Sequence, residues 1–480
     1  MEPDTSSPLD APADRWLALA VALLSFAWLW PTLGRFRLLD ADELTHARAA
    51  LEAARDGHWL PLTVGGRVWL EKPPLLPWAT ALLIRFFGPG EAVLRFWPLA
   101  FGAASLGLAY GVARRLGASR SAALAGAALL GTSRDLLYHA RFLSMDTGLL
   151  AAFLAALLAW DPRRPWRSGL LLGLAAALKS WFVLALLPAF GLALLAAAPW
   201  ERRAGLRLLG FPAAALLLWL AAYTAVAGPA FLAEEWSVNL WGRFSGAGHP
   251  ASAPPVDFYT GWARLFFPAA LVCAPLALGQ AWRDRRSWKA WTFLRRAAVA
   301  FLVSWGLGLL AVRVTVYHYL LPWGVVAVLL AAAGVEGLPG AAWALWAVLG
   351  AAVFWMAPRL GLAHGWVWAA AALSGLLGLW PESPRRRAWK GAVLAGASVL
   401  ALSLGGGWAY WRFPPDPHGP LVQALRSRPA PSPGAELWVQ GPATQAIDYY
   451  SNWKPLFSAE APPPGRPALR YNGQSAEFFQ

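Results

Sequence analysis

Residues 39–78 read LDADELTHARAALEAARDGHWLPLTVGGRVWLEKPPLLPW, and this polar stretch lies between two apolar segments. Glu43 completes a capping box with the acid three residues before it, and apolar residues then recur at helical spacing until Gly57. The glycine pair further on is typical of a tight turn between short strands. The stretch therefore predicts a helix that begins near Asp42, then a hairpin, and a loop that brings acidic and basic side chains together.

The composition indicates a membrane protein. Of 480 residues, 58% are hydrophobic and 14% are charged, and 31 are Trp. Apolar runs that approach the roughly 20 residues needed to cross a bilayer recur along the chain, often with Trp at their ends. We therefore expect an all-α polytopic membrane protein with about 13 transmembrane helices and with extracytoplasmic juxtamembrane helices. The expected spans are residues 16–33, 94–112, 116–132, 147–160, 168–178, 181–198, 206–227, 265–282, 297–312, 319–335, 341–356, 366–380 and 391–411.

Arginine-rich loops set the expected orientation. The net charge of +15 arises largely from short basic loops between apolar runs, and the positive-inside rule places these loops in the cytoplasm. The other loops, including residues 34–91, then lie outside. We expect a transmembrane domain over residues 1–411 and a small α/β extracytoplasmic region over residues 412–480. A basic balance of this kind is explained by topology, so we expect no nucleic-acid partner.

Asp42 and Asp146 are the acids that this topology places at the outer edge of the bilayer. Each also fits a helix cap, which is common for Asp and stabilises a helix by about 1 kcal/mol. Charge is costly to hold at this depth, however, and both acids fall on the same side of the membrane. The pair therefore favours a catalytic role, while capping stays open for each.

Several cations in the outer loops suit a phosphate group. Lys72 lies next to Glu71, and an ion pair between them or snorkelling to the interface is the alternative. Arg243 lies in the third outer loop, and Arg313 precedes the run Tyr317, His318 and Tyr319. Converging cations would bind a lipid phosphate at the level of the headgroups.

A metal site is a weaker hypothesis. Glu71 and His249 would suit a divalent metal ion, although a lone His more often has a structural role. The single Cys273 lies in an apolar run and excludes a disulfide within the chain.

The sequence also resembles the membrane glycosyltransferases of the C-type fold, in the aminoarabinose transferase (ArnT-like) and protein O-mannosyltransferase group. The resemblance covers roughly residues 15–330. The residues that carry it are Asp42-Glu43, Glu71-Lys72-Pro73-Pro74, Leu94-Arg95 to Pro98, Asp146 and Tyr319-Leu-Leu-Pro322. Trp69 stands where relatives often have Tyr.

What the resemblance implies is a polyprenyl-phosphate-linked sugar donor and an acceptor outside the membrane. It implies that residues 34–91 are the first outer catalytic loop, that Asp42 with Glu43 is at the catalytic position, and that Asp146 is the second outer-loop acid. Lys72 would lie near the donor phosphate, with Arg243 a looser match. Beside this implication, we expect Arg313 and Tyr319 to contact the phosphate as well. We expect an integral protein of a bacterial inner membrane with an extracytoplasmic active site.

The expected reaction is an inverting transfer in which a carboxylate takes the acceptor's proton. The acceptor is a lipid, a glycan or a protein, and the sugar a hexose or pentose. A multi-span transporter or lipid flippase is the alternative, but that class favours charges near the midplane, whereas these gather near the ends of spans. A silent membrane scaffold is a further alternative.

Overall fold

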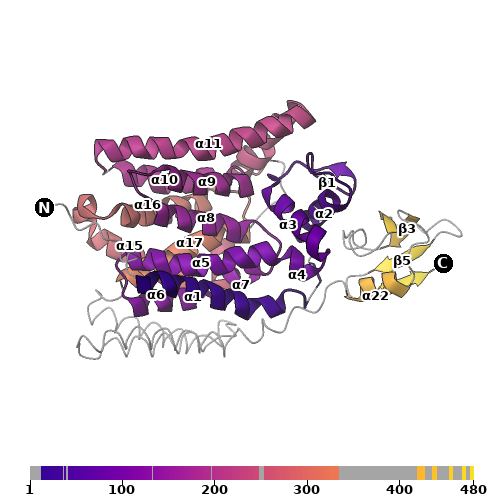
Figure 1. Ribbon diagram of the computed structural model, residues 1–480, viewed down its shortest axis with the longest axis horizontal. Coiled ribbons are helices and arrows are strands. Elements are labelled where there is room, and N and C mark those ends of the chain that lie inside the picture. The colour runs from indigo at the N-terminus through magenta and orange to yellow at the C-terminus, as the bar shows by residue number, and fades with distance from the viewer. Residues whose placement is uncertain are drawn as a thin grey trace. The chain divides into compact units, whose positions relative to one another are not determined.

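The computed structural model describes residues 12–35, 37–38, 42–131, 133–195, 197–247, 253–334, 419–427, 435–440, 453–457, 467–471 and 476–479 (Figure 1). The chain divides into two compact units, and each is described by itself. A helical unit comprises residues 1–28, 99–140 and 145–411, and a first-loop unit comprises residues 29–98, 141–144 and 412–480.

The segments of the helical unit are apolar and form helices, because a helix satisfies the hydrogen bonds of its own backbone, as a bilayer requires. These helices pack into a bundle. Its N-terminal elements are α1 (Pro12–Leu29), α5 (Phe96–Arg115), α6 (Arg120–Gly131), α7 (Arg134–Ala140), α8 (Asp146–Ala159), α9 (Trp166–Lys179), α10 (Phe182–Leu195) and α11 (Pro199–Ala227). After these follow α12 (Ala230–Glu234), η3 (Glu235–Leu240), α13 (Trp241–Ser245), α14 (Pro255–Phe266), α15 (Pro268–Arg283), η4 (Arg285–Ala290), α16 (Phe293–Ala311), η5 (Tyr317–Tyr319) and α17 (Leu320–Gly334).

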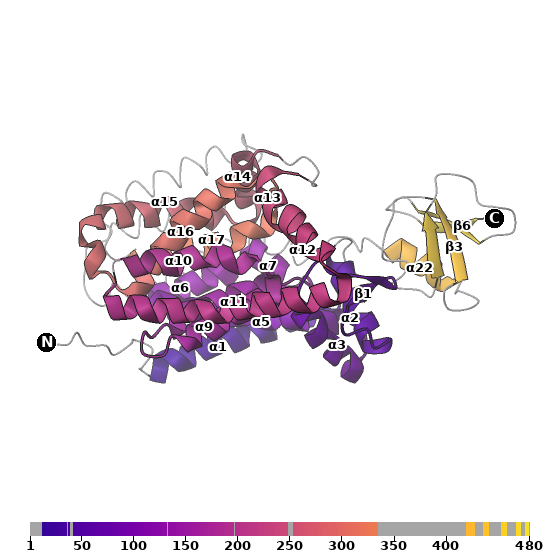
Figure 2. The same cartoon turned by 90° about the horizontal axis from the view of Figure 1, so that it is seen from above.

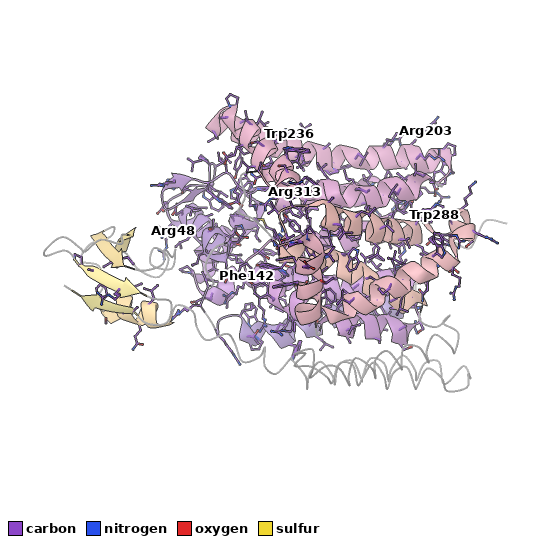
Figure 3. All side chains as sticks on the ribbon, turned by 180° about the vertical axis from the view of Figure 1, so that it is seen from behind. Arg48, Phe142, Arg203, Trp236, Trp288 and Arg313 are labelled. Carbon is purple, nitrogen blue, oxygen red and sulfur yellow. The ribbon has the colours of Figure 1, made fainter. Side chains whose placement is uncertain are left out.

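Helices α8, α9, α10 and α11 run alongside one another in this bundle (Figure 1), and Figure 2 shows α9, α10 and α11 from above. Side chains fill the space between the helices (Figure 3). Phe153 of α8 packs on Phe301 of α16 with ring centroids 4.6 Å apart. Gly169 lets α9 approach α11, since a Cβ there would meet the Phe211 ring at 2.5 Å. Small residues at such crossings allow close helix packing where the hydrophobic effect cannot drive it.

Within the described residues, five helices are long and apolar enough to cross a membrane. They are Pro12–Thr32, Phe96–Arg115, Pro199–Ala227, Phe293–Ala311 and Tyr317–Gly334. Expected spans 147–160 and 181–198 correspond to the shorter apolar helices α8 and α10. The last three expected spans, from residue 341 onward, lie outside the described residues.

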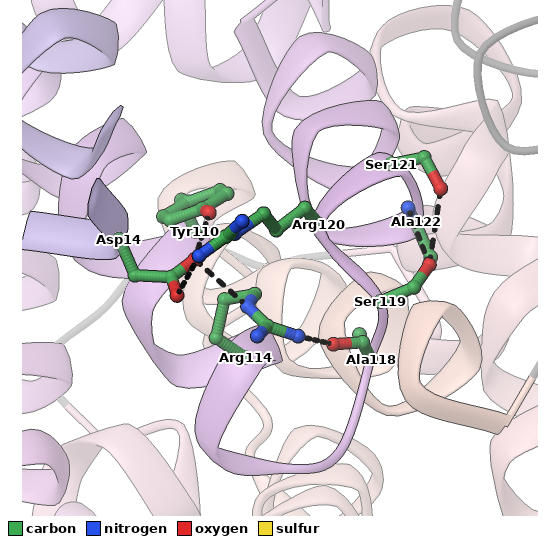
Figure 4. A network of polar contacts seen from close by, with 8 residues as sticks. All are labelled: Asp14, Tyr110, Arg114, Ala118, Ser119, Arg120, Ser121 and Ala122. Atoms are coloured by element: carbon green, nitrogen blue, oxygen red, sulfur yellow. Dashed lines mark hydrogen bonds and ion pairs between the residues drawn. The ribbon is translucent and has the colours of Figure 1, made fainter. Parts of the chain in front are cut away.

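A buried carboxylate joins three helices of this unit (Figure 4). Asp14 of α1 is 1% exposed and accepts hydrogen bonds from Tyr110 Oη at 2.6 Å, Arg114 Nε at 3.0 Å and Arg120 Nε at 3.1 Å. Arg114 also donates to the carbonyl of Ala118, which closes the α5–α6 connection. Arginines of an expected cytoplasmic loop therefore hold the start of α1.

The first-loop unit carries the stretch with which the sequence analysis began. It contains η2 (Trp30–Thr32), α2 (Asp42–Arg55), the hairpin β1 (Thr63–Val64) and β2 (Arg67–Val68), α3 (Leu75–Phe87) and α4 (Glu91–Leu94). Its C-terminal part has α22 (Gly419–Ser427), β3 (Ala435–Gln440), β4 (Trp453–Phe457), β5 (Ala468–Tyr471) and β6 (Ala476–Phe479). Those strands form a sheet of order β4-β3-β5-β6, in which β3 is parallel to β4 and β5, and β5 is antiparallel to β6.

Candidate functional site

Asp42 is the first residue of α2, and it is exposed. The first turn of a helix carries a partial positive charge that favours a carboxylate there. The expected capping partner Asp40 lies outside the described residues. Asp42 is therefore accessible to solvent at the start of α2.

Glu43, its neighbour, has a different environment. It is 0% exposed, as is Arg95. Arg95 donates from Nε to one carboxylate oxygen at 2.7 Å and from Nη2 to the other at 3.0 Å. The Leu143 amide donates to Glu43 at 2.9 Å, and Arg95 also donates to the carbonyls of Leu33 and Arg37. Both oxygens of Glu43 are thus occupied, which favours a structural role for this member of the expected catalytic pair.

His46 lies one turn after Asp42, and the sequence analysis did not single it out. It is 5% exposed, and its Nδ1 lies 3.1 Å from the carbonyl oxygen of Leu143. A carbonyl only accepts, so Nδ1 carries the hydrogen and Nε2 is left as an acceptor. Burial lowers the pKa of His46, although the nearby Asp42 charge opposes this shift. The ring packs edge-on against Trp69, with centroids 5.6 Å apart.

Glu52, at the other end of α2, holds the hairpin. Its carboxylate accepts from Thr63 Oγ1 at 2.5 Å, from the amides of Gly65 and Gly66 at 2.8 and 3.3 Å, and from Arg48 Nε at 2.6 Å. Burial alone would raise the pKa of Glu52, but the bonds from Thr63 and Arg48 bring it below the usual value. Both glycines have positive φ, 63° and 73°, which only glycine adopts without strain. Side chains of α2 thus fix the turn that the glycine pair predicted.

Glu71 and Lys72 follow this hairpin and pair with each other. Lys72 Nζ lies 2.5 Å from Glu71 Oε1. The other expected metal ligand, His249, lies outside the described residues. Among the residues that are described, no group of three His, Cys, Asp or Glu side chains could hold a metal ion. Glu71 therefore forms an ion pair with Lys72, and a metal ion at Glu71 and His249 stays a prediction.

In the helical unit, Asp146 is the centre of a buried polar cluster. Lys179 Nζ donates to its Oδ1, and His139 Nδ1 lies 3.8 Å from its Oδ2. On its other side His139 Nε2 lies 3.6 Å from Asp135, which accepts from Trp262 Nε1 at 3.0 Å. Burial raises the pKa of Asp135 to about 7 and lowers that of His139 to about 4. The histidine is thus neutral at neutral pH. Burial would raise the pKa of Asp146, but the charges of His318 and Lys179 hold it below its usual value.

Arg243 and Arg313 are brought together although they are far apart in the sequence. The carbonyl of Arg243 accepts from the amides of Arg313 and Val314 at 3.0 and 3.1 Å. Gly246 (φ 79°) ends α13 and lies against Arg313, since a Cβ there would be 3.6 Å from Arg313 Cβ. Arg243 is half-buried and Arg313, labelled in Figure 3, is exposed. Neither guanidinium makes a hydrogen bond or ion pair with the residues that the structure describes.

The tyrosine-rich run follows directly as η5. Tyr319 is 6% exposed, and its carbonyl accepts from Trp305 Nε1 at 2.7 Å. Tyr317 stacks between Trp262 and His139, with centroids 4.7 and 5.6 Å away. Of the expected residues, the helical unit contains Asp146, Arg243, Arg313 and Tyr319, whereas the first-loop unit contains Asp42, Glu43, Glu71 and Lys72.

Sequence reasoning missed Lys179, His139 and Asp135 as neighbours of Asp146. For His139 a signal existed, because Asp135, His139 and Asp146 fall in one short loop that the sequence predicts to lie outside, and the first two are four residues apart on a helix. Lys179 is a lysine at the end of an apolar run, and it looks like an interfacial anchor until the fold places it against Asp146.

Comparison with known proteins gives a fold and a match of part of the chain to one family model. Residues 71–226 match the family described as Dolichyl-phosphate-mannose-protein mannosyltransferase. An uncharacterized protein of Aquifex aeolicus (strain VF5) is 29% identical over 119 residues. That match covers 25% of this chain and 24% of the relative, so the chain spans about a quarter of the relative's length there.

Among solved structures, ArnT from Cupriavidus metallidurans bound to undecaprenyl phosphate superposes with a TM-score of 0.70 at 17% identity, over 96% of this chain and 93% of that one. The apo state of the same protein gives 0.65 at 18% identity, over 94% and 87%. The chain is therefore an integral membrane protein with the ArnT-like GT-C fold.

Proposed function

We propose, from the ArnT-like GT-C fold as premise, that this chain is a membrane glycosyltransferase that moves a sugar from a polyprenyl-phosphate donor to an extracytoplasmic acceptor. The match of residues 71–226 to a mannosyltransferase family supports the reaction class. The similar ArnT structure holds undecaprenyl phosphate, which supports the lipid-phosphate donor. The sugar is a hexose or pentose, and the acceptor is a lipid, a glycan or a protein.

The observation that carries this proposal is the Arg243–Arg313 juxtaposition. Their backbones are hydrogen-bonded, and no described carboxylate neutralises either guanidinium. Two adjacent unneutralised cations suit the oxygens of a phosphate, which arginine binds through a planar pair of donors. We assign donor-phosphate contacts to this pair and to Tyr319 in the helical unit, and to Lys72 in the first-loop unit.

The proposed chemistry is a single inverting displacement. The acceptor oxygen attacks the anomeric carbon, and the bond from that carbon to the lipid phosphate breaks with its electron pair leaving on the phosphate. The acceptor's proton passes to a carboxylate. Asp42 is the first choice for this base, because it is exposed at the start of α2, and Asp146 is the second.

A divalent metal ion at Glu71 and His249 stays a separate proposal, and no step above requires it. Because Glu71 already pairs with Lys72, we expect transfer to persist after rigorous chelation. Loss of transfer on chelation, with recovery when one divalent ion is restored, would contradict that expectation. Metal content of the purified protein is the accompanying measurement.

Transfer of label from a polyprenyl-phosphate sugar to an envelope fraction tests the proposal. We expect membranes that contain the protein to transfer label, and Arg243→Ala and Arg313→Ala each to weaken donor use. The transporter or flippase alternative predicts movement of lipid across the bilayer with no new glycosidic bond. Lipid translocation without label transfer would therefore overturn the proposed glycosyltransferase function and favour the transporter or flippase.

A further inference from the structure

A strained turn lies between α9 and α10. Ser180 has φ 43° and ψ −121°, and among the described residues it is the only non-glycine with positive φ. Residues of this kind persist where surrounding contacts hold them, and they concentrate at functional sites. The turn is fixed at both ends, because the Ser180 amide donates to Ala176 at 2.8 Å and the Leu184 amide donates to Trp181 at 2.9 Å.

The side chains of this turn reach different parts of the candidate site. Lys179, 5% exposed, pairs with Asp146. Trp181 Nε1 donates to Glu235 at 2.9 Å. The ring centroids of Phe182 and Tyr319 are 4.8 Å apart. Lys179 Nζ lies over the Phe182 ring, 4.6 Å from its centroid. Residues 179–182, which we call the 179–182 turn, thus contact three separate elements.

Glu235 connects the turn to Arg243. It is 2% exposed and begins η3, a π-helix, where Asn239 donates to its other oxygen at 2.5 Å. The π-helix continues directly into α13, which bears Arg243. Single π-helical turns are rare in proteins as a whole, and those that occur are frequently at functional sites. The indole of Trp181 therefore fixes the start of the segment that presents the cation.

We propose that the 179–182 turn is a positioning element, in which Trp181 sets the place of Arg243 for donor binding and Lys179 sets the place of Asp146 for the chemical step. This inference rests on the proposed function. Neither side chain contacts a reacting atom, and each acts through one acid. The positive φ of Ser180 lets successive side chains reach Asp146 and Glu235 at once.

Substitutions at Trp181 and Lys179, two residues apart, should then change different kinetic parameters. Trp181→Phe keeps the ring and removes the indole N–H. A hydrogen bond to a charged group contributes enough that we expect donor KM and the Kd for undecaprenyl phosphate to rise about tenfold, with kcat within about twofold. Lys179→Met keeps the chain length and removes the charge. We expect it to lower kcat at least about tenfold and to leave the Kd for undecaprenyl phosphate unchanged.

Ser180 itself supplies a matched pair. Ser180→Gly should raise the thermal unfolding midpoint and leave both kinetic parameters near wild type, because glycine accepts this conformation. Ser180→Val should worsen both parameters. Trp166→Phe, the same replacement at an exposed Trp of α9, is the control and should change neither.

Direct binding of undecaprenyl phosphate to the purified full chain, beside the transfer assay, separates the two proposals. Absence of transfer by wild type would overturn the proposed function, and the binding arm would still test the link from Trp181 to Arg243. The positioning role is overturned if Trp181→Phe and Lys179→Met change the same parameter, or if both lose activity only in proportion to a lower unfolding midpoint. It is also overturned if Ser180→Gly impairs either parameter.

Discussion

Asp42 can act as a helix cap, as a base, or as both, and a single substitution separates these roles. Asp42→Asn keeps an oxygen suited to capping, so the unfolding midpoint should stay near wild type. An amide cannot take the acceptor's proton, and general-base catalysis typically contributes 10²- to 10⁴-fold, so turnover should fall at least about a hundredfold. Steady-state transfer with the purified protein is the measurement. If more than about a tenth of turnover remains, the role passes to Asp146.

Arg95 and Glu43 should matter for stability whatever the chemistry. Both are fully buried, so Arg95→Met leaves a buried carboxylate without its cation, which typically costs about 3–5 kcal/mol. Thermal unfolding in detergent should show the loss. Arg37→Met is the matched control, because the Arg37–Glu91 pair is 26% and 18% exposed and such pairs contribute about 1 kcal/mol or less. Equal losses in both variants would contradict the structural role of Glu43.

Asp42 and Glu43 also show how much of the site could be predicted from the sequence at the scale of residues. The start of the helix at Asp42 was predictable from local spacing. The pairing of Glu43 was not, because its partner Arg95 lies 52 residues away and the two meet only through the fold. Lys179 and Asp146 are likewise 33 residues apart. The sequence pattern could indicate which acids are candidate catalytic residues. It could not distinguish an exposed carboxylate from one that is buried and neutralised by an arginine.

At the scale of elements, the β1–β2 hairpin depends on α2 for its position. Glu52→Gln replaces a carboxylate that accepts from a hydroxyl, an arginine and backbone amides, so we expect a loss of about 1–3 kcal/mol. The peptide bonds near residues 60–70 should become more sensitive to limited proteolysis. Lys72 follows the hairpin, so donor KM should rise as well.

Arg48→Ala is the control for the hairpin. It removes one partner of Glu52 but leaves the bonds to Thr63 and the glycine amides, so proteolysis near residues 60–70 should change little. Equal sensitivity of the two variants would show that Glu52 does not hold the hairpin.

Helices were more predictable than their ends or their contacts. Five expected spans coincide with helices long and apolar enough to cross a membrane. Such spans are predictable because the bilayer sets the length of the apolar run and requires a helix that satisfies its own backbone hydrogen bonds. The π-helix at Glu235–Leu240 and the positive φ of Ser180 had no comparable signal. Both depend on side chains from other elements, such as Trp181 on Glu235, and a local pattern does not contain that information.

At the scale of the whole molecule, the proposed chemistry requires the candidate residues to face outward. The 179–182 turn, the segment with Arg243, and Arg313 with η5 fall in loops of the same parity when the expected spans are counted. The basic loops fall on the opposite parity, which the positive-inside rule assigns to the cytoplasm. One orientation therefore accounts for all of these loops together.

Cysteine labelling in intact cells tests that orientation. Arg67 of β2 and Arg203 of α11 are both exposed, so a thiol at either place would react wherever the reagent has access. The sole native cysteine, Cys273, is buried, and Cys273→Ala provides a background without thiols. An impermeant maleimide should label Arg67→Cys from outside and should label Arg203→Cys only after the membrane is permeabilised. Labelling of Arg203→Cys alone in intact cells would reverse the orientation, and it would put the Asp42 loop on the side where an extracytoplasmic acceptor is absent.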